Sequence, residues 1–121
     1  FTEGYLRALA LCDRTLARVC DAVAEDEVFV CTESAEINLS CRCVVHFERW
    51  ILGCIRAGRD DYRRFDGTGK IIIADDVFCG VVPVDETVRL WREEAGRTLT
   101  GLCARADSVT RVFCGLARRL K

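Results

Sequence analysis

The spacing of apolar residues changes at His46, and this change constrains the fold more than any other feature of the chain. From Glu36 to His46 apolar and polar residues alternate, which is typical of a half-buried strand. The apolar positions of this segment are Ile37, Leu39, Cys41, Cys43 and Val45. From Phe47 to Ala57 apolar residues recur every three or four positions, and Gly58 follows as a helix-ending residue. The sequence therefore predicts a strand that passes directly into a helix.

Further elements are predicted on both sides of this junction. They are a helix over 3–23, a strand over 28–32, a loop over 59–69, a central strand over 70–74, a strand over 77–82 and a helix over 84–95. A turn near Ser34 would join the first two strands as a hairpin. The order α-β-β-α-β-β-α-(β)-α predicts an α/β fold, with a central sheet of about four to five strands and helices packed on it. We expect residues 1–121 to form a single domain of a longer chain, since the chain contains no methionine.

Two arrangements are open for the C-terminal third. In the first, residues 98–103 form a strand and 109–120 form a last helix, capped by Asp107 or Ser108. In the second, one helix runs from 84 to 120 and forms a coiled-coil seam. The seam would comprise Ala95, Leu99, Leu102, Ala106, Val109, Phe113, Leu116 and Leu120. The first arrangement is favoured, because Gly96 and Gly101 each destabilise a helix interior by about 1 kcal/mol.

The chain has nine cysteines, an odd number. Most of them fall at apolar positions of the predicted elements, so we expect reduced, buried thiols rather than a secreted disulfide scaffold. This places the protein inside the cell, in the cytoplasm or nucleus. Cys31, Cys41 and Cys43 are candidates for a zinc site, since three thiolates can hold zinc. Burial as small hydrophobic residues is the favoured interpretation, and no cofactor is expected.

The overall charge and hydropathy exclude some classes of partner. The formal net charge is −1, which argues against nucleic acid as a partner. There is no apolar run of about 18 residues that would predict a membrane span. Half of the residues are apolar, so the chain can build a core of its own.

Two short motifs suggest chemistry but have simpler interpretations. The segment Gly67–Lys70 resembles part of a phosphate-binding loop, but Arg64 and Ile71 occupy two positions that the motif requires to be Gly and Ser or Thr. We interpret it as a turn. Asp75 and Asp76, with Asp85 and Glu86 further on, could hold Mg²⁺ or transfer protons. A solvated loop followed by an acidic first helical turn is the favoured interpretation.

The triplet His46-Phe47-Glu48 lies at the predicted strand-to-helix junction, and His46 is the only histidine. With this order of elements it resembles the zinc-dependent cytidine and nucleobase deaminases. The resemblance implies that His46 binds zinc and that Glu48 transfers protons at a zinc-bound water. The family's second motif, P-C-x-x-C, would begin at Pro83, but Val84 and Thr87 occupy the two ligand positions. The resemblance therefore implies a deaminase-like enzyme or a pseudoenzyme, and we expect no tightly bound zinc.

The favoured function is a non-enzymatic protein-interaction or scaffold domain of a larger intracellular protein or complex. Its partner surface is predicted in the C-terminal third, where apolar residues are flanked by arginines. The candidate contact residues are Arg111, Phe113, Leu116, Arg118 and Arg119. Two alternatives to this function stay open. One is a deaminase-like enzyme or pseudoenzyme, and the other is homodimerisation through a C-terminal coiled coil.

Overall fold

The computed structural model describes residues 25–75, 84–113 and 116–121. Within these ranges the chain is a mixed α/β protein with two α-helices and five strands. The helices are α3 (Phe47–Arg56) and α4 (Glu86–Arg105), and 3₁₀ turns cover Glu25–Glu27 and Asp61–Arg64. The strands are β1 (Val28–Val30), β2 (Cys43–Val45), β3 (Ile71–Ile73), β4 (Thr110–Phe113) and β5 (Leu116–Arg119). The helix predicted over 3–23 and the strand predicted over 77–82 lie outside the described residues.

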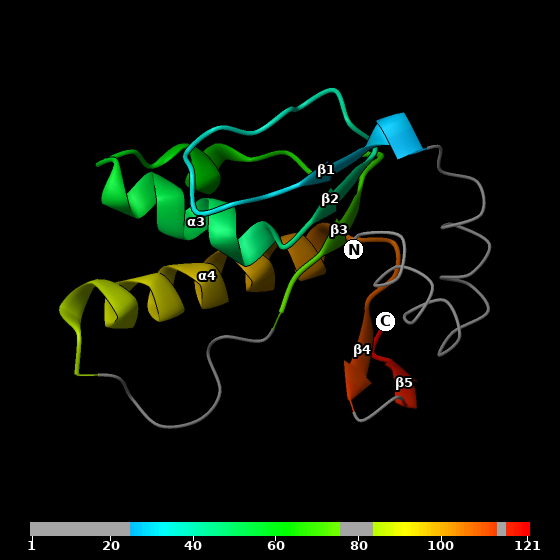
Figure 1. Ribbon diagram of the computed structural model, residues 1–121. Helices are drawn as coiled ribbons and strands as arrows, with labels where there is room; N and C mark the ends of the chain where they lie inside the picture. The colour runs from blue at the N-terminus through cyan, green and yellow to red at the C-terminus, as the bar shows by residue number, and fades with distance from the viewer. Residues whose placement is uncertain (1–24, 76–83, 114–115) are drawn as a thin grey trace.

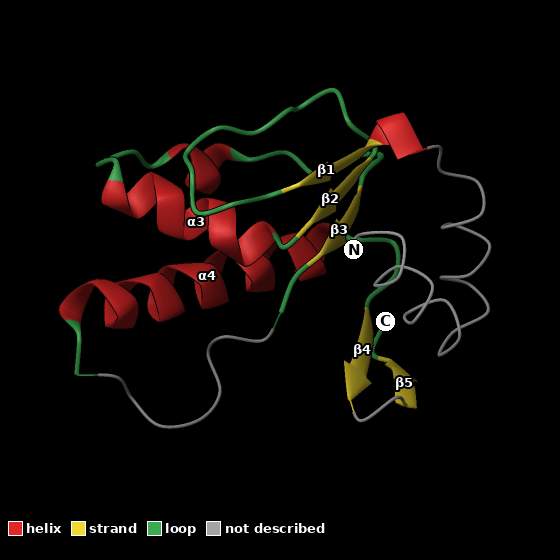
Figure 2. Ribbon diagram, viewed as in Figure 1, coloured by secondary structure: helices red, strands yellow, loops and turns green. Residues whose placement is uncertain are grey.

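Strands β1, β2 and β3 form a parallel sheet in that order, and both helices pack against one of its faces (Figures 1 and 2). Parallel strands cannot be joined by a tight turn, so the predicted hairpin at Ser34 is wrong. A loop over 31–42 carries the chain from β1 to β2 instead. The predicted central strand was β3, but β2 is the middle strand of the described sheet. This sheet has three strands, fewer than the four to five predicted.

The strand predicted over 36–46 is formed only at Cys43–Val45. Upstream of it, Asn38 makes a local turn in which its Oδ1 accepts from the backbone N–H of Ser40 at 3.0 Å. Such side-chain bonds compete with strand pairing, and Leu39, predicted to face the core, is 59% exposed. The loop is fixed to α3 instead, because Trp50 Nε1 donates to the Ala35 carbonyl at 3.0 Å.

The main core lies between the sheet and the two helices. Three aromatic rings form its centre: the Phe47 centroid is 4.8 Å from that of Phe65 and 5.4 Å from that of Trp50. Val44 contributes from the sheet side of this cluster. Its remaining buried members are Cys31, Ile51, Cys54, Tyr62, Ala95 and Leu102. A smaller cluster of Cys43, Val45 and Ile73 covers the opposite face of the sheet.

Helix α4 is continuous through Gly96 and Gly101, so the predicted break and the strand over 98–103 are both wrong. Burial of Ala95 and Leu102 in the core offsets the helix-weakening effect of the glycines. The helix ends at Arg105, so the alternative of one helix to residue 120 is wrong as well, and the eight coiled-coil positions do not share one helix. None of the described helices is long and apolar enough to span a bilayer.

The last helix predicted over 109–120 is also wrong, because β4 and β5 pair there as an antiparallel hairpin. Val109, Thr110 and Val112 are β-branched and favour strands over helices. The apolar spacing of three and four residues in this segment therefore does not reflect a helix.

The burial predicted for the cysteines is confirmed at four of the five that are described. Cys31, Cys41, Cys43 and Cys54 are buried, whereas Cys103 is exposed. Burial raises the pKa of the Cys31 thiol to about 12, and the neighbouring Glu48 carboxylate acts in the same direction. Burial also raises the pKa of Cys54. The raised pKa values favour the protonated form of both thiols. The location of the protein inside the cell stays a prediction.

Candidate functional site at the carboxyl edge of the sheet

Three side chains that can bind a metal converge where β2 and β3 end. His46 directly follows β2, Glu48 is in the first turn of α3, and Asp75 is two residues beyond β3. The His46 Nδ1 atom lies 3.4 Å from an Asp75 carboxylate oxygen and 3.7 Å from a Glu48 carboxylate oxygen. One ligand atom from each of the three residues lies within 4.8 Å of the others. We refer to His46, Glu48 and Asp75 as the carboxyl-edge cluster.

The topology explains why these residues meet. Parallel strands end at the same edge of a sheet, and the crevice outside their carboxyl ends is where open α/β sheets bind ligands. Since β2 and β3 are neighbours and in register from Cys43 and Ile71 onward, the residues that follow them emerge side by side. The cluster therefore lies at the carboxyl edge of the described sheet.

The cluster is buried on one side and open on the other. His46 and Glu48 are only 3% and 2% exposed, whereas the Asp75 side chain is about half exposed. Burial raises the pKa of the Glu48 carboxyl, and the hydrogen bond from the Asp75 backbone N–H to Glu48 Oε1 at 2.8 Å opposes this effect. The Arg49 N–H donates to the other Glu48 oxygen at 3.1 Å. Backbone donors therefore fix the Glu48 carboxylate beside His46.

The backbone at His46 is strained. Its φ of 57° and ψ of 46° place it in the left-handed region, and it is the only non-glycine residue with positive φ in the described part of the chain. Such a conformation costs on the order of 1–3 kcal/mol and is concentrated at functional sites. The strain arises because the chain leaves β2 and enters α3 within a single residue. This sharp turn places the imidazole in the cluster.

Two of the other acidic candidates, Asp85 and Glu86, are not part of this group of possible ligands. Asp85 caps α4, where its Oδ1 accepts from the Val88 N–H at 3.1 Å, and Glu86 follows in the first turn of α4. Asp76 lies outside the described residues. The sequence interpretation of Asp75 as part of a solvated loop missed its role in the cluster. The sequence feature that could have indicated Asp75 is its position just beyond a β-branched strand. This position points to the cluster only once that strand is known to pair in parallel with β2.

The turn interpretation of Gly67–Lys70 is confirmed. The Lys70 N–H donates to the Gly67 carbonyl at 3.0 Å, and Gly69 has a φ of 71°. The Lys70 ammonium donates to the carbonyls of Leu39 and Cys41. This lysine therefore holds the 31–42 loop against the sheet.

Within the described residues, Cys31, Cys41 and Cys43 are not brought together as a group of metal ligands. Cys31 belongs to the main core on the helix side of the sheet, whereas Cys43 belongs to the smaller cluster on the other face. A hairpin between the first two strands could have brought Cys31 near the other two thiols, but β1 and β2 are parallel. In the described part of the chain, the carboxyl-edge cluster is the one group of three such residues placed to hold a metal.

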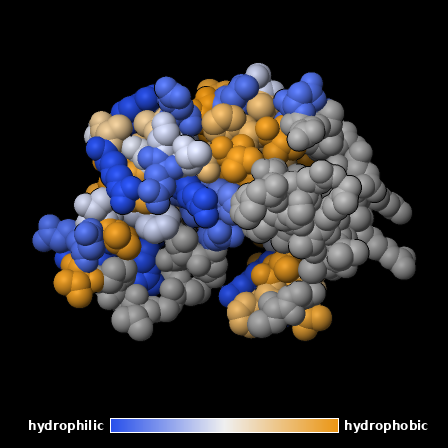
Figure 3. Space-filling model, viewed as in Figure 1, coloured by the Kyte–Doolittle hydropathy of each residue, from blue (hydrophilic) through white to orange (hydrophobic). Residues whose placement is uncertain are grey.

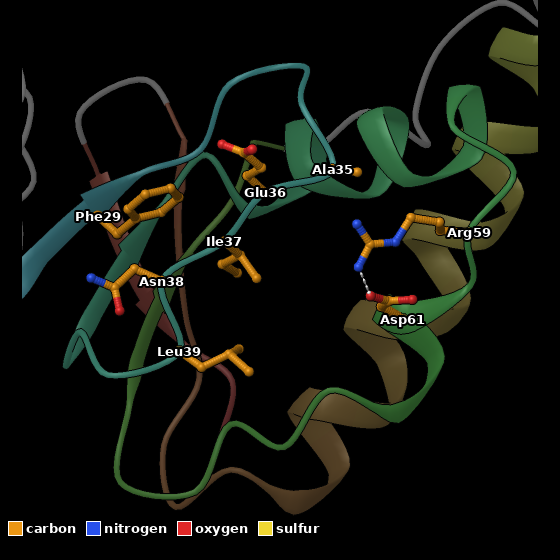
Figure 4. Close-up of a pocket in the computed structure, with 8 residues that line it drawn as sticks. All are labelled: Phe29, Ala35, Glu36, Ile37, Asn38, Leu39, Arg59 and Asp61. Carbon is orange, nitrogen blue, oxygen red and sulfur yellow. Dashed lines mark hydrogen bonds and ion pairs between the residues drawn. The ribbon is translucent and has the colours of Figure 1, made fainter.

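A hollow lies beside the C-terminal end of α3. It has a volume of about 540 Å³, and Arg59 and Asp61 form an ion pair on one side of it (Figure 4). Its other lining residues are Phe29, Ala35, Glu36, Ile37, Asn38 and Leu39. Arg59 follows the C-terminal end of α3, whereas the carboxyl-edge cluster lies at its N-terminal end. The hollow is therefore separate from the cluster.

In comparisons with known proteins, the chain matches no family model and no curated protein. Its function is therefore inferred from the geometry of its own residues. The predicted partner-binding residues all belong to β4 and β5, which form a sheet separate from the one that carries the cluster.

Proposed function

We propose that this domain binds a divalent metal ion at the carboxyl-edge cluster, with His46, Glu48 and Asp75 as its protein ligands. The observation that carries the proposal is the convergence of one imidazole nitrogen and two carboxylate oxygens, each within 4.8 Å of the others. Two of these three side chains are buried, so their geometry is fixed by the core and by the backbone hydrogen bonds to Glu48. Three protein ligands leave coordination positions open, as in catalytic rather than structural metal sites.

The ligand types favour a transition metal over Mg²⁺ or Ca²⁺. Imidazole suits zinc, iron and nickel, whereas magnesium and calcium prefer oxygen ligands alone. Manganese and zinc accept the mixed set that His46, Glu48 and Asp75 offer. This differs from the expectation of no bound zinc drawn from the sequence, because Asp75 supplies a ligand that the H-x-E motif does not predict.

The surroundings favour an anionic ligand at the open positions of the metal. The cluster lies at the N-terminal end of α3, and a helix N-terminus favours negative charge. A metal bound there would polarise a phosphate or carboxylate oxygen of the ligand. In the deaminase-like alternative, His46 would also bind a metal. Glu48 would then transfer protons rather than bind the metal, and two further metal ligands would be required after Pro83. Val84, at the first of those positions, is almost fully exposed.

Metal titration of the chain tests this function. We expect Mn²⁺ or Zn²⁺ to bind chelator-treated protein with one site per chain, as measured by calorimetry. Asp75→Asn should weaken that binding at least about tenfold, because it replaces a charged ligand with a weaker neutral one. Asp75 is half exposed, so the variant should keep its fold, which circular dichroism checks.

A matched control is available at Asp60, whose side chain has similar exposure and lies in an ion pair with Arg64. Asp60→Asn should leave metal affinity within about twofold of the unchanged chain. Equal affinity of the Asp75→Asn and Asp60→Asn variants would show that the metal binds elsewhere.

A second proposed function is the non-enzymatic protein-interaction role. It is supported by two large apolar side chains on the β4–β5 hairpin, since Phe113 is 68% and Leu116 is 75% exposed. The two functions use different parts of the fold and are compatible with each other.

A further inference from the structure

The first turn of α3, which carries Glu48, is tied to α4 by a side-chain hydrogen bond. Trp91 in α4 donates from its indole Nε1 atom to the backbone carbonyl of Glu48 at 2.7 Å. A carbonyl oxygen has two lone pairs, so it can accept this bond in addition to a bond within its own helix. Trp91 therefore contacts the backbone of one of the three proposed metal ligands.

Helix α4 is attached to the rest of the domain through a narrow set of residues. In this fully described helix, three of 20 residues are buried, namely Glu94, Ala95 and Leu102. The surface over α3 and α4 is mostly hydrophilic in the view of Figure 3. A guanidinium N–H of Arg63 donates to the Glu94 carboxylate at 2.6 Å, in the middle of the helix. Trp91 lies in the second turn of α4 and connects its N-terminal part to the carboxyl-edge cluster.

The bond from Trp91 fixes Glu48 from the side opposite to its carboxylate. The two carboxylate oxygens already accept from the backbone N–H groups of Arg49 and Asp75. The indole adds a bond at the carbonyl, and Trp91 is itself packed against the main core. Glu48 is therefore held at its side chain by the carboxyl edge of the sheet and at its backbone by α4.

We infer that Trp91 is a positioning residue for the metal site, and that its hydrogen bond to the Glu48 carbonyl couples metal binding to the packing of α4 on α3. This inference rests on the proposed metal-binding function. The indole acts through the backbone, by holding the first turn of α3 where the Glu48 carboxylate faces His46 and Asp75. Coupling between two equilibria is reciprocal. A shift of α4 away from α3 therefore lowers the metal affinity, and a bound metal strengthens the attachment of α4.

Trp91→Phe tests this coupling, because it keeps an aromatic ring in the core and removes the N–H donor. Trp50→Phe is the matched control, since the Trp50 indole also donates to a backbone carbonyl, that of Ala35, at 3.0 Å. In a calorimetric titration with Zn²⁺, Trp91→Phe should raise the dissociation constant about three- to tenfold. Trp50→Phe should leave it within about twofold. Trp50 is the more deeply buried of the two, so a general loss of packing would weaken binding at least as much in the control.

Tryptophan emission gives a second readout that a purely structural role would not change. The chain has two tryptophans, so Trp91 is the only one left in the Trp50→Phe variant. Its emission should change on addition of Zn²⁺, with the midpoint that calorimetry gives, because the metal fixes the residue to which the indole is bonded. This measurement needs only Trp50→Phe, so it decides the question even where Trp91→Phe does not fold.

The outcomes separate this inference from the metal site itself. Equal Zn²⁺ affinity of the two tryptophan variants, or no zinc-dependent emission change in Trp50→Phe, would overturn the inference and leave the metal site in place. Failure of the unchanged chain to bind Zn²⁺ would instead contradict the proposed function, and the inference with it.

Discussion

Gly53→Ala is expected to destabilise the domain by about 1–3 kcal/mol, although alanine is the better helix former. A Cβ atom at position 53 would lie 2.3 Å from the Ser34 carbonyl carbon and 2.4 Å from its oxygen. These are backbone atoms of the 31–42 loop, which the Trp50 side chain also holds to α3. The loop must move away from the helix to make room, and the overpacking exceeds the gain in helix propensity of about 1 kcal/mol. Urea denaturation of the two chains measures the difference.

Gly101→Ala is the matched control, since Gly101 is also inside a helix. A Cβ atom there would meet only the end of the flexible Arg105 side chain, at 3.6 Å. This substitution should stabilise the domain by about 0.5–1 kcal/mol. The packing of the loop on α3 would be contradicted if both glycine variants gained stability to the same extent.

Phe47→Ala is expected to have a still larger effect, a loss of about 3–5 kcal/mol in the free energy of unfolding. Phe47 is fully buried, and its ring contacts those of Phe65 and Trp50 at the centre of the main core. Truncation removes these contacts and leaves a cavity between the sheet and α3. Because Phe47 precedes Glu48, the variant should also loosen the first turn of α3 and weaken metal binding.

The exposed Phe113 provides the comparison for Phe47. Phe113→Ala should change the free energy of unfolding by no more than about 0.5 kcal/mol, since the side chain is mostly in solvent. Similar losses of stability at positions 47 and 113 would contradict the assignment of Phe47 to the core.

The sequence predicts the local features of this fold well. The helical spacing after His46 and the glycine at position 58 predict α3 closely, and Gly58 has the positive φ expected of a residue just beyond a helix. The β-branched run over 71–73 is a strand, as predicted. The H-x-E triplet indicates His46 and Glu48 as candidates, and both belong to the cluster. These features depend on residues close together in the chain.

The features that sequence reasoning missed depend on distant contacts. Alternation over 36–46 predicts a strand, but the pairing of β1 with β2 is parallel, so most of this segment becomes the connecting loop. Apolar spacing over 109–120 is compatible with a helix, and only the pairing of β4 with β5 shows that it belongs to a hairpin. Asp75 joins His46 because β2 and β3 are neighbours in the sheet, which no spacing in the sequence reveals.

The most direct test of the proposed metal site is anomalous diffraction from a crystal of the chain soaked in Mn²⁺. We predict a single strong peak about 2.0–2.3 Å from an imidazole nitrogen of His46 and from carboxylate oxygens of Glu48 and Asp75. The peak should disappear in crystals of the Asp75→Asn variant and persist in those of Asp60→Asn. A saturating soak that gives no peak between these three side chains, or a peak that the Asp75→Asn variant retains, would contradict the account.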